Sequence, residues 1–180
     1  QARSAFYEVK DGVSQYASPS LYYFSHIEYS AGSYQSALEG FKKLENDEQF
    51  GRVVPYYILQ IYYLQGDFEK VTEYAPSLET ATIVNQKDVN HLIGDAYYRV
   101  GKYDEAVPYL EEYDKASETT RDEDYQLGFA YYKSSEFEKA IKLLDRVGRV
   151  KDSLGQVAFY QIGESFIQLK NFSAARDAFL

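Results

Sequence analysis

The sequence contains no cysteine, no methionine and no tryptophan, and only four prolines among its 180 residues. Without cysteine the chain forms no disulfide, no thiolate metal site and no cysteine nucleophile. It has no stretch of about 18 apolar residues of the kind that spans a membrane. Lysine and arginine do not cluster and the net charge is −9. Nucleic-acid binding needs a positive stripe, so no nucleic-acid partner is expected.

A motif recurs along the chain at near-constant spacing. Gly94 and Gly128, which occupy equivalent places in it, are 128 − 94 = 34 residues apart. An interval of roughly 34 residues is the signature of helix–turn–helix repeats that stack into a solenoid. The sequence therefore predicts an all-α solenoid of antiparallel helix pairs in one domain. Its parts are the second helix of a preceding repeat plus a linker at 1–17, and repeats at 18–51, 52–86, 87–120, 121–155 and 156–180, the last truncated.

Small residues at two recurring positions are predicted to form the contact between the helices of each pair. Glycine inside a helix costs about 1 kcal/mol relative to alanine, so its recurrence indicates close helix packing. The first-helix set is Ser25, Gly94, Gly128 and Gly163, with Leu59 in repeat two, where a wider contact is expected. The second-helix set is Ala37, Val71, Ala106, Ala140 and Ala175. Within residues 1–17, Ala2, Phe6 and Val9 have the spacing of the apolar residues in the second helices of the later repeats.

The turns carry their own signals. Gly32, Gly66 and Gly101 are predicted to adopt the left-handed conformation that ends a helix, and Ser33 and Asp67 to cap the helix that follows. The aromatic residues predicted to cover the end of each hairpin are Tyr34, Phe68, Tyr103, Phe137 and Phe172.

Two prolines fall within predicted second helices. Pro108 lies near a helix start, where proline is tolerated. Pro76 lies deeper and is expected to shorten or kink its helix, so that residues 79–89 become a longer connection.

The run from Gly94 to Ala106 reads Gly-Asp-Ala-Tyr-Tyr-Arg-Val-Gly-Lys-Tyr-Asp-Glu-Ala. It resembles the tetratricopeptide repeat almost position for position. The resemblance implies a right-handed superhelix in which first helices line the concave face and second helices the convex face. A narrower similarity, in residues 22–27 and 53–58, is to large periplasmic repeat proteins of Bacteroidetes bacteria, which implies an envelope scaffold.

This similarity favours a periplasmic or outer-membrane-associated location, while the composition suits a cytoplasmic protein equally well. We expect the chain to be a piece of a longer protein. Its apolar solenoid ends would then be exposed and could pair two copies into a homodimer.

Side chains three, four and seven residues apart share one side of a helix, which selects those expected on the concave face. The predicted groove consists of Tyr22, His26, Tyr29, Tyr56, Gln60, Tyr63, His91, Asp95, Tyr98, Tyr125, Phe129, Tyr132, Tyr160, Glu164 and Ile167. Tyrosine combines a large apolar ring with a hydroxyl and orders at low entropic cost, which suits an extended peptide or a helix as partner. The residues expected to be exposed are Tyr22, Tyr56, Tyr125 and Tyr160. Those that could instead only pack between adjacent repeats are Tyr29, Tyr63, Tyr98 and Tyr132.

No metal, cofactor or catalytic residue is predicted. His26 and His91 lie two repeats apart, too far to ligate one metal ion. His91 and Asp95 are interpreted as a hydrogen-bonded pair in the groove. The Lys/Asn/Arg clamp with which some members of the resembled family bind a C-terminal carboxylate is missing.

We therefore expect a non-enzymatic protein–protein interaction scaffold that holds a partner protein or peptide in an aromatic groove. Two alternatives stay open. Stacked tyrosine rings could bind a glycan or peptidoglycan, or the repeats could be a spacer or self-assembling module of the cell envelope.

Overall fold

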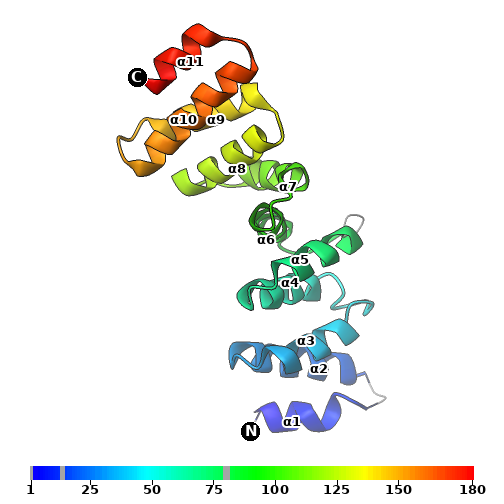
Figure 1. Ribbon diagram of the computed structural model, residues 1–180. Coiled ribbons are helices and arrows are strands. Elements are labelled where there is room, and N and C mark those ends of the chain that lie inside the picture. Colours follow the sequence, from blue (N-terminus) through cyan, green and yellow to red (C-terminus); the bar gives the residue numbers. More distant parts are fainter. Residues whose placement is uncertain (1, 13–14, 79–81) are drawn as a thin grey trace. The chain divides into compact units, whose positions relative to one another are not determined.

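The computed structural model describes residues 2–12, 15–78 and 82–180, and over these residues it contains helices and no β strand (Figure 1). The all-α prediction is thus confirmed. The first helices of the repeats are α2 (Ala17–Ser30), α4 (Val54–Leu64), α6 (Gln86–Arg99), α8 (Arg121–Lys133) and α10 (Ser153–Gln168). The second helices are α1 (Ala2–Val9), α3 (Tyr34–Lys43), α5 (Phe68–Tyr74), α7 (Tyr103–Ala116), α9 (Phe137–Gly148) and α11 (Phe172–Phe179).

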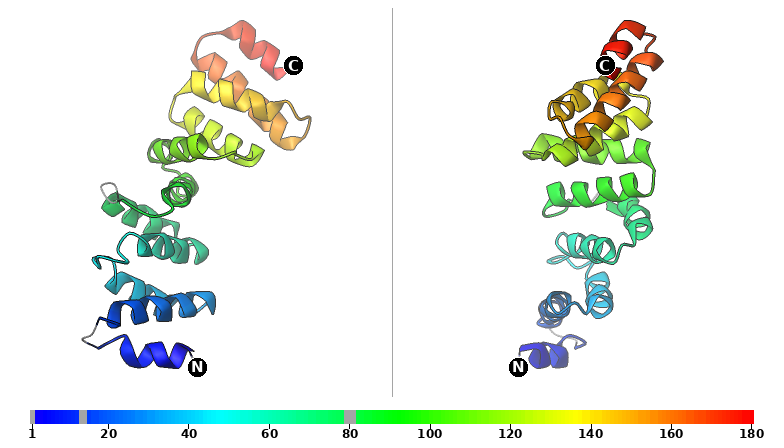
Figure 2. Two further views of the ribbon diagram at one scale, coloured as in Figure 1. Left: turned by 180° about the vertical axis from the view of Figure 1, so that it is seen from behind. Right: turned by 60° about the vertical axis from the view of Figure 1, so that its left-hand side comes forward.

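The chain divides into two compact units, residues 1–92 and 93–180. In unit 1, α2 packs against α1 and α3, and α4 packs against α3 and α5. In unit 2, the same sequential packing runs from α7 through α11, as the green to red helices of Figure 2 show. Each helix is therefore buried mainly by its neighbours in the chain, as expected of a repeat protein. No helix in the described ranges combines the length and apolar character needed to cross a bilayer.

The recurring glycines lie where paired helices touch. A Cβ atom on Gly94 would lie 2.8 Å from Leu110 Cδ2, and one on Gly128 would lie 2.8 Å from Leu144 Cδ2. Both distances are shorter than real Cβ contacts, so only glycine allows the two backbones this approach. The prediction that these glycines form the helix–helix contact is confirmed. The small residues of the second helices are buried as well; Ala106, for example, is 0% exposed.

Repeats one and two form this contact differently. In repeat one, a Cβ on Gly40 would lie 1.9 Å from Ser25 Oγ, so the close approach depends on a glycine of the second helix. In repeat two, Leu59 is completely buried, and Ala75 stands where Leu110 stands in repeat three. A large first-helix residue is thus matched with a small second-helix residue. The wider contact expected at Leu59 stays a prediction.

The turn positions share one backbone conformation. Gly32, Gly66 and Gly101 have φ of 77°, 75° and 77°, as predicted. The equivalent residues of the last two turns, Ser135 and Lys170, also lie in the left-handed region, at 62° and 59°. This conformation costs an L-residue about 1–3 kcal/mol, so these two turns are strained where the first three are not.

The predicted capping by Ser33 and Asp67 is corrected by the structure. Both occupy the N-cap position, but neither side chain accepts a capping hydrogen bond. Their ψ angles of 59° and 62° depart from the extended backbone that aims a cap side chain at the helix amides. Thr120 has ψ of 163°, and it forms a capping box with Glu123 at the start of α8.

The prolines behave as predicted. Helix α5 ends at Tyr74, and Pro76 lies in the 3-10 segment η1 (Ala75–Leu78) that follows. Helix α7 continues through Pro108. Of the predicted connection at 79–89, residues 79–81 lie outside the described residues, and α6 begins at Gln86.

Two predictions about the ends of the chain are wrong. Helix α1 has no buried residue, and Ala2 and Val9, expected in an apolar stripe, are exposed. Phe172, expected to cover the last hairpin, is 67% exposed. The physical reason is the same in both cases: α1 and α11 each have neighbours on one side in the structure, so part of their apolar surface meets no partner.

Candidate interaction surface

The aromatic residues of unit 1 form one connected cluster on α2, α3 and α4. Its centre is Tyr57, whose ring centroid lies 5.0 Å from that of Phe41, 5.4 Å from that of His26 and 5.6 Å from that of Tyr29. Tyr57 is absent from the predicted groove. It follows Tyr56, and successive helix residues are rotated by about 100°, so it faces the preceding helix pair. The adjacent tyrosines were the signal that could have indicated it.

A glutamine joins two predicted groove tyrosines of unit 1. The Tyr29 hydroxyl donates a hydrogen bond to Gln60 Oε1 at 2.9 Å, and Gln60 Nε2 donates one to the Tyr56 hydroxyl at 2.7 Å. All three side chains are half-buried. The prediction therefore placed residues together that do meet, and their hydroxyls are already engaged with each other through one amide.

In unit 2 the equivalent cluster is centred on Phe129. Its ring centroid lies 5.5 to 6.1 Å from the rings of Tyr98, Tyr103, Tyr125 and Tyr132. The ammonium of Lys133 lies 6.0 Å from the centroid of the Phe129 ring, within cation–π range. Tyr98 of α6 and the predicted groove residues of α8 thus form a continuous aromatic surface.

Helix α10 extends this surface. Gln161 Nε2 donates a hydrogen bond to the Tyr125 hydroxyl at 2.8 Å. Tyr160 is 58% exposed, as expected, whereas Tyr125, also expected to be exposed, is half-buried. Burial raises the pKa of Tyr132, and the nearby Glu164 carboxylate and Tyr160 hydroxyl raise it further. Tyr132, Tyr160 and Glu164 therefore share one neighbourhood, with Ile167 exposed further along α10.

The last tyrosine of each first helix has a packing role. In repeats one to four its ring lies against the aromatic residue five positions later, across the turn. These pairs are Tyr29–Tyr34 at 6.0 Å, Tyr63–Phe68 at 5.3 Å, Tyr98–Tyr103 at 5.5 Å and Tyr132–Phe137 at 6.4 Å. Tyr29 and Tyr98 also contact the next repeat. Each of the four stays half-buried, so packing and partial exposure coexist.

Asp95 does not lie open in the groove as predicted. It is 8% exposed, and its carboxylate accepts hydrogen bonds from Arg99 Nε and from Gln126 Nε2, the latter at 2.6 Å. A buried carboxylate is costly unless it is paired and hydrogen-bonded, and here both conditions are met. Asp95 therefore connects α6 to α8 instead of offering a charge to a ligand. His91, on the same helix, is half-buried.

The half-buried tyrosines of the aromatic surface remain protonated at neutral pH. Burial raises the pKa of Tyr98 to about 12, with smaller contributions from Tyr125 and Tyr103. Burial also raises the pKa of Tyr22 and of Tyr56, the latter with the Asp88 carboxylate nearby. The aromatic surface thus offers neutral rings and hydroxyl groups rather than phenolates.

Among the described residues no group of three or more His, Asp or Glu side chains could hold a metal ion. His26 instead packs against the rings of Tyr22 and Tyr57.

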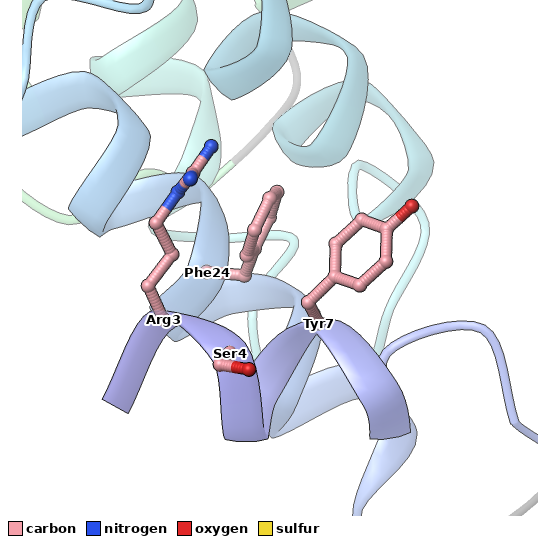
Figure 3. A pocket seen from close by; sticks show the side chains of 4 residues that line it. All are labelled: Arg3, Ser4, Tyr7 and Phe24. Carbon is pink, nitrogen blue, oxygen red and sulfur yellow. The ribbon is translucent and has the colours of Figure 1, made fainter. Parts of the chain in front are cut away.

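A separate hollow of about 450 Å³ lies between α1 and α2. It is lined by Arg3, Ser4, Tyr7 and Phe24, whose side chains Figure 3 shows. The Arg3 guanidinium lies 5.8 Å from the Phe24 ring centroid, and the Lys10 ammonium lies 4.8 Å from that of Tyr7. Cations of the chain itself thus already occupy positions over these rings.

The fold has solved relatives. YrrB, described as a TPR protein with an unusual peptide-binding site, superposes with a TM-score of 0.71 at 17% identity, covering 98% of this chain and 88% of that one. The chain therefore shares the fold of tetratricopeptide repeat proteins. MamA AMB-1 gives a TM-score of 0.65 at 22% identity, with 92% of this chain and 90% of that one covered. MamA from Desulfovibrio magneticus RS-1 gives 0.59 at 20% identity, with 90% of each chain covered.

The family model described as anaphase-promoting complex, cyclosome, subunit 3 matches residues 103–180, the last part of the chain. No curated protein matches the sequence. At these identities the structural relatives establish the fold, and the function has to be argued from the surface.

Proposed function

We propose that the chain is a non-enzymatic protein-interaction scaffold whose first-helix aromatic surface binds an extended segment or a helix of a partner protein. The observation that carries the proposal is the half-buried state of the tyrosines. Tyr56 and Tyr125 are held by hydrogen bonds to Gln60 and Gln161, and yet part of each ring remains accessible. Rings that are already ordered lose little entropy on binding, so contact with a partner yields more net affinity.

The comparisons support this proposal at the level of the fold. Tetratricopeptide repeats are the fold of YrrB, whose description includes a peptide-binding site. Repeat proteins of this kind present extended surfaces on which several units act together. For this chain, peptide binding rests on the tyrosines themselves.

A carbohydrate ligand is the alternative, and ring geometry favours the peptide over it. Sugar rings bind best to open aromatic faces. Here the Tyr22 ring stacks on Phe50 at 4.5 Å and 16°, and the Tyr125 ring stacks on Phe129 at 6.0 Å and 25°. Rings whose faces are stacked within the protein leave mainly their edges for a partner, and ring edges suit the backbone and side-chain contacts of a peptide. Tyr160, at 58% exposure, is the ring most open to a glycan.

The test is partner capture by matched variants. Tyr125→Ala and Tyr56→Ala should leave the helical circular dichroism signal intact and weaken capture of partner proteins from a lysate of the source organism. Phe172→Ala is the control, because Phe172 is 67% exposed and lies outside the surface. If the double tyrosine variant captures the same proteins in the same amounts as the wild type, the proposal is wrong. Saturable binding of a glycan in a tyrosine fluorescence titration, lost in the same variants, would favour the carbohydrate alternative.

A further inference from the structure

Unit 2 contains a cavity of about 330 Å³ that none of the predicted groove residues lines. It lies between α7, α8 and α9. Its apolar wall is formed by Leu127, Tyr131 and Leu143, each at most 8% exposed. This volume lies within the range typical of ligand pockets, about 300 to 1,000 Å³.

Two other repeats of the chain place a tyrosine at this position, whereas repeat one has Gly40 and repeat five has Ala178. Val71 and Ala140 are equivalent residues, and 140 − 71 = 69, so Leu143 of repeat four corresponds to Tyr74 of repeat two. The interval of 143 − 109 = 34 makes Tyr109 the corresponding residue of repeat three. Among repeats two, three and four, repeat four thus has an aliphatic side chain, Leu143, where the other two have tyrosine.

Tyr74 and Tyr109 each contact a residue of a neighbouring helix. Tyr74 donates a hydrogen bond from its hydroxyl to Glu45, and its pKa is raised by burial and by that carboxylate. Tyr109 stacks on Tyr97, with ring centroids 5.8 Å apart and an angle of 19°. Repeats two and three thus accommodate a phenol ring at this position.

The hydrogen-bond acceptor for such a phenol is retained beside Leu143, in the preceding repeat. Asp114 corresponds to Glu45, since 114 − 45 = 69, and it lines the cavity. Its carboxylate accepts a hydrogen bond of 3.3 Å from the Thr119 hydroxyl, which leaves further acceptor capacity. The cavity thus keeps the carboxylate that pairs with tyrosine in repeat two while lacking the tyrosine.

The rim of the cavity carries the opposite charge to the chain as a whole. Lys139, Lys142 and Arg146 line it from one face of α9, in a chain of net charge −9. The residues of repeat two that correspond to Lys142 and Arg146 are Glu73 and Ser77.

Part of this positive charge is unpaired. The Arg146 guanidinium pairs with Asp124 through one nitrogen, at 2.6 Å, and its side chain stays 53% exposed. Lys139 pairs with Glu111 at 2.9 Å and with Glu136 at 2.7 Å. Lys142 forms no ion pair with any residue in the described ranges. An acidic ligand therefore finds cations on the rim at Lys142 and Arg146.

We propose that this cavity binds a tyrosine side chain carried by an acidic segment of a partner protein. The ring lies against Leu127 and Leu143, and its hydroxyl donates a hydrogen bond to Asp114. Carboxylates on either side of the tyrosine pair with Lys142 and Arg146. None of the predicted groove tyrosines lines this site. The proposal can therefore be tested independently of the function proposed above.

The test is fluorescence anisotropy with a fluorescein-labelled peptide, Gly-Ser-Glu-Glu-Tyr-Glu-Glu-Ser-Gly. Two companion peptides replace either the tyrosine with alanine or all four glutamates with lysine. We expect saturable binding of the first peptide and at least about ten-fold weaker binding of each companion, a difference of about 1.4 kcal/mol. Equal binding of the alanine peptide, equal binding of the lysine peptide, or no binding of the first peptide up to roughly millimolar concentration would each overturn the proposal.

Variants of the protein locate the site. Leu143→Tyr restores the residue found at Tyr74 and Tyr109, so it should fill the cavity, retain the fold and abolish binding. Lys142→Gln should weaken binding by about two- to five-fold, the range of a solvent-exposed ion pair. Lys151→Gln, an exposed lysine outside the cavity, is the matched control and should bind as the wild type does.

Unchanged binding by both cavity variants would refute the assignment even if the peptide binds elsewhere. If Leu143→Tyr fails to fold, the site is tested with Lys142→Glu, which should weaken binding of the acidic peptide. Lys142 is exposed, and its replacement disturbs no ion pair within the described residues. Tyr125→Ala, which alters the first-helix surface, should leave binding of this peptide unchanged.

Discussion

Replacing Gly128 with alanine should destabilise the protein, although alanine is the better helix former. Alanine gains about 1 kcal/mol of helix propensity over glycine. Its Cβ, however, would lie 2.8 Å from Leu144 Cδ2 and 2.9 Å from Leu144 Cγ. Leu144 is completely buried, so its side chain cannot move outward into solvent. Overpacking of this kind typically costs about 1–3 kcal/mol, so the net loss should be about 0–2 kcal/mol.

The matched control is Gly163→Ala. The new Cβ would meet the ring of Phe179, at 2.4 Å from Cζ, but that ring is 46% exposed and can move outward. Gly163→Ala should therefore be near neutral or gain up to about 1 kcal/mol. The assay is urea unfolding followed by circular dichroism, with the midpoint and slope compared among wild type and both variants.

A double-mutant cycle gives the sharpest form of this test. Leu144→Ala alone should cost about 2–5 kcal/mol by leaving a cavity. In that background the Cβ at position 128 has room, so Gly128→Ala should recover about 1 kcal/mol instead of losing stability. If Gly128→Ala raises the midpoint in the wild-type background as much as Gly163→Ala does, the close helix contact at Gly128 does not exist as described.

Three further predictions follow from particular residues. Ser135→Gly should stabilise the protein by about 1 kcal/mol, because Ser135 has φ of 62°, a conformation that glycine adopts without strain. Ser134→Gly is the control: Ser134 has φ of −85°, so this change should cost about 0.5–1 kcal/mol. Equal shifts of the two melting temperatures would contradict the claim that Ser135 is strained. Burial raises the folded-state pKa of Tyr98 to about 12, so stability should be complete below the unfolded value near pH 10 and fall as the pH rises toward 12. Tyr98→Phe should lessen that alkaline loss, and a melting profile unchanged by the substitution would contradict it. Phe172 and Phe179 are 67% and 46% exposed, and such exposed apolar rings should promote self-association of the protein. Phe172→Glu should therefore lower the average mass measured by sedimentation at high protein concentration. A wild-type mass that does not change with concentration would exclude a dimer formed through these residues.

Local and periodic features were readable from the sequence because they depend on residues close together in the chain. The spacing of Gly94 and Gly128 predicted a helix contact that the structure contains. Positive φ at Gly66 and the early end of the helix before Pro76 follow from the backbone chemistry of glycine and proline. Capping by Ser33 was wrong because residue preference does not reveal the ψ angle on which the hydrogen bond depends.

The interaction surface was predictable in part. Helical spacing grouped Tyr29, Tyr56 and Gln60, which are hydrogen-bonded in the structure. It missed Tyr57, because the tilt of one helix pair against the next decides which ring enters the interface. It also left Asp95 exposed, since burial of that carboxylate depends on Gln126 of the next repeat.

Periodicity thus established the helix pairs, their turns and the glycine contacts, since each depends on intervals within one repeat of about 34 residues. The cavity beside Leu143 and the pairing of Asp95 depend on how consecutive repeats pack together. A side chain at such an interface is buried, paired or left open according to neighbours contributed by a different repeat. Those neighbours become known when the helices are placed in space, which is why the packing of the repeats decided the chemistry of the surface.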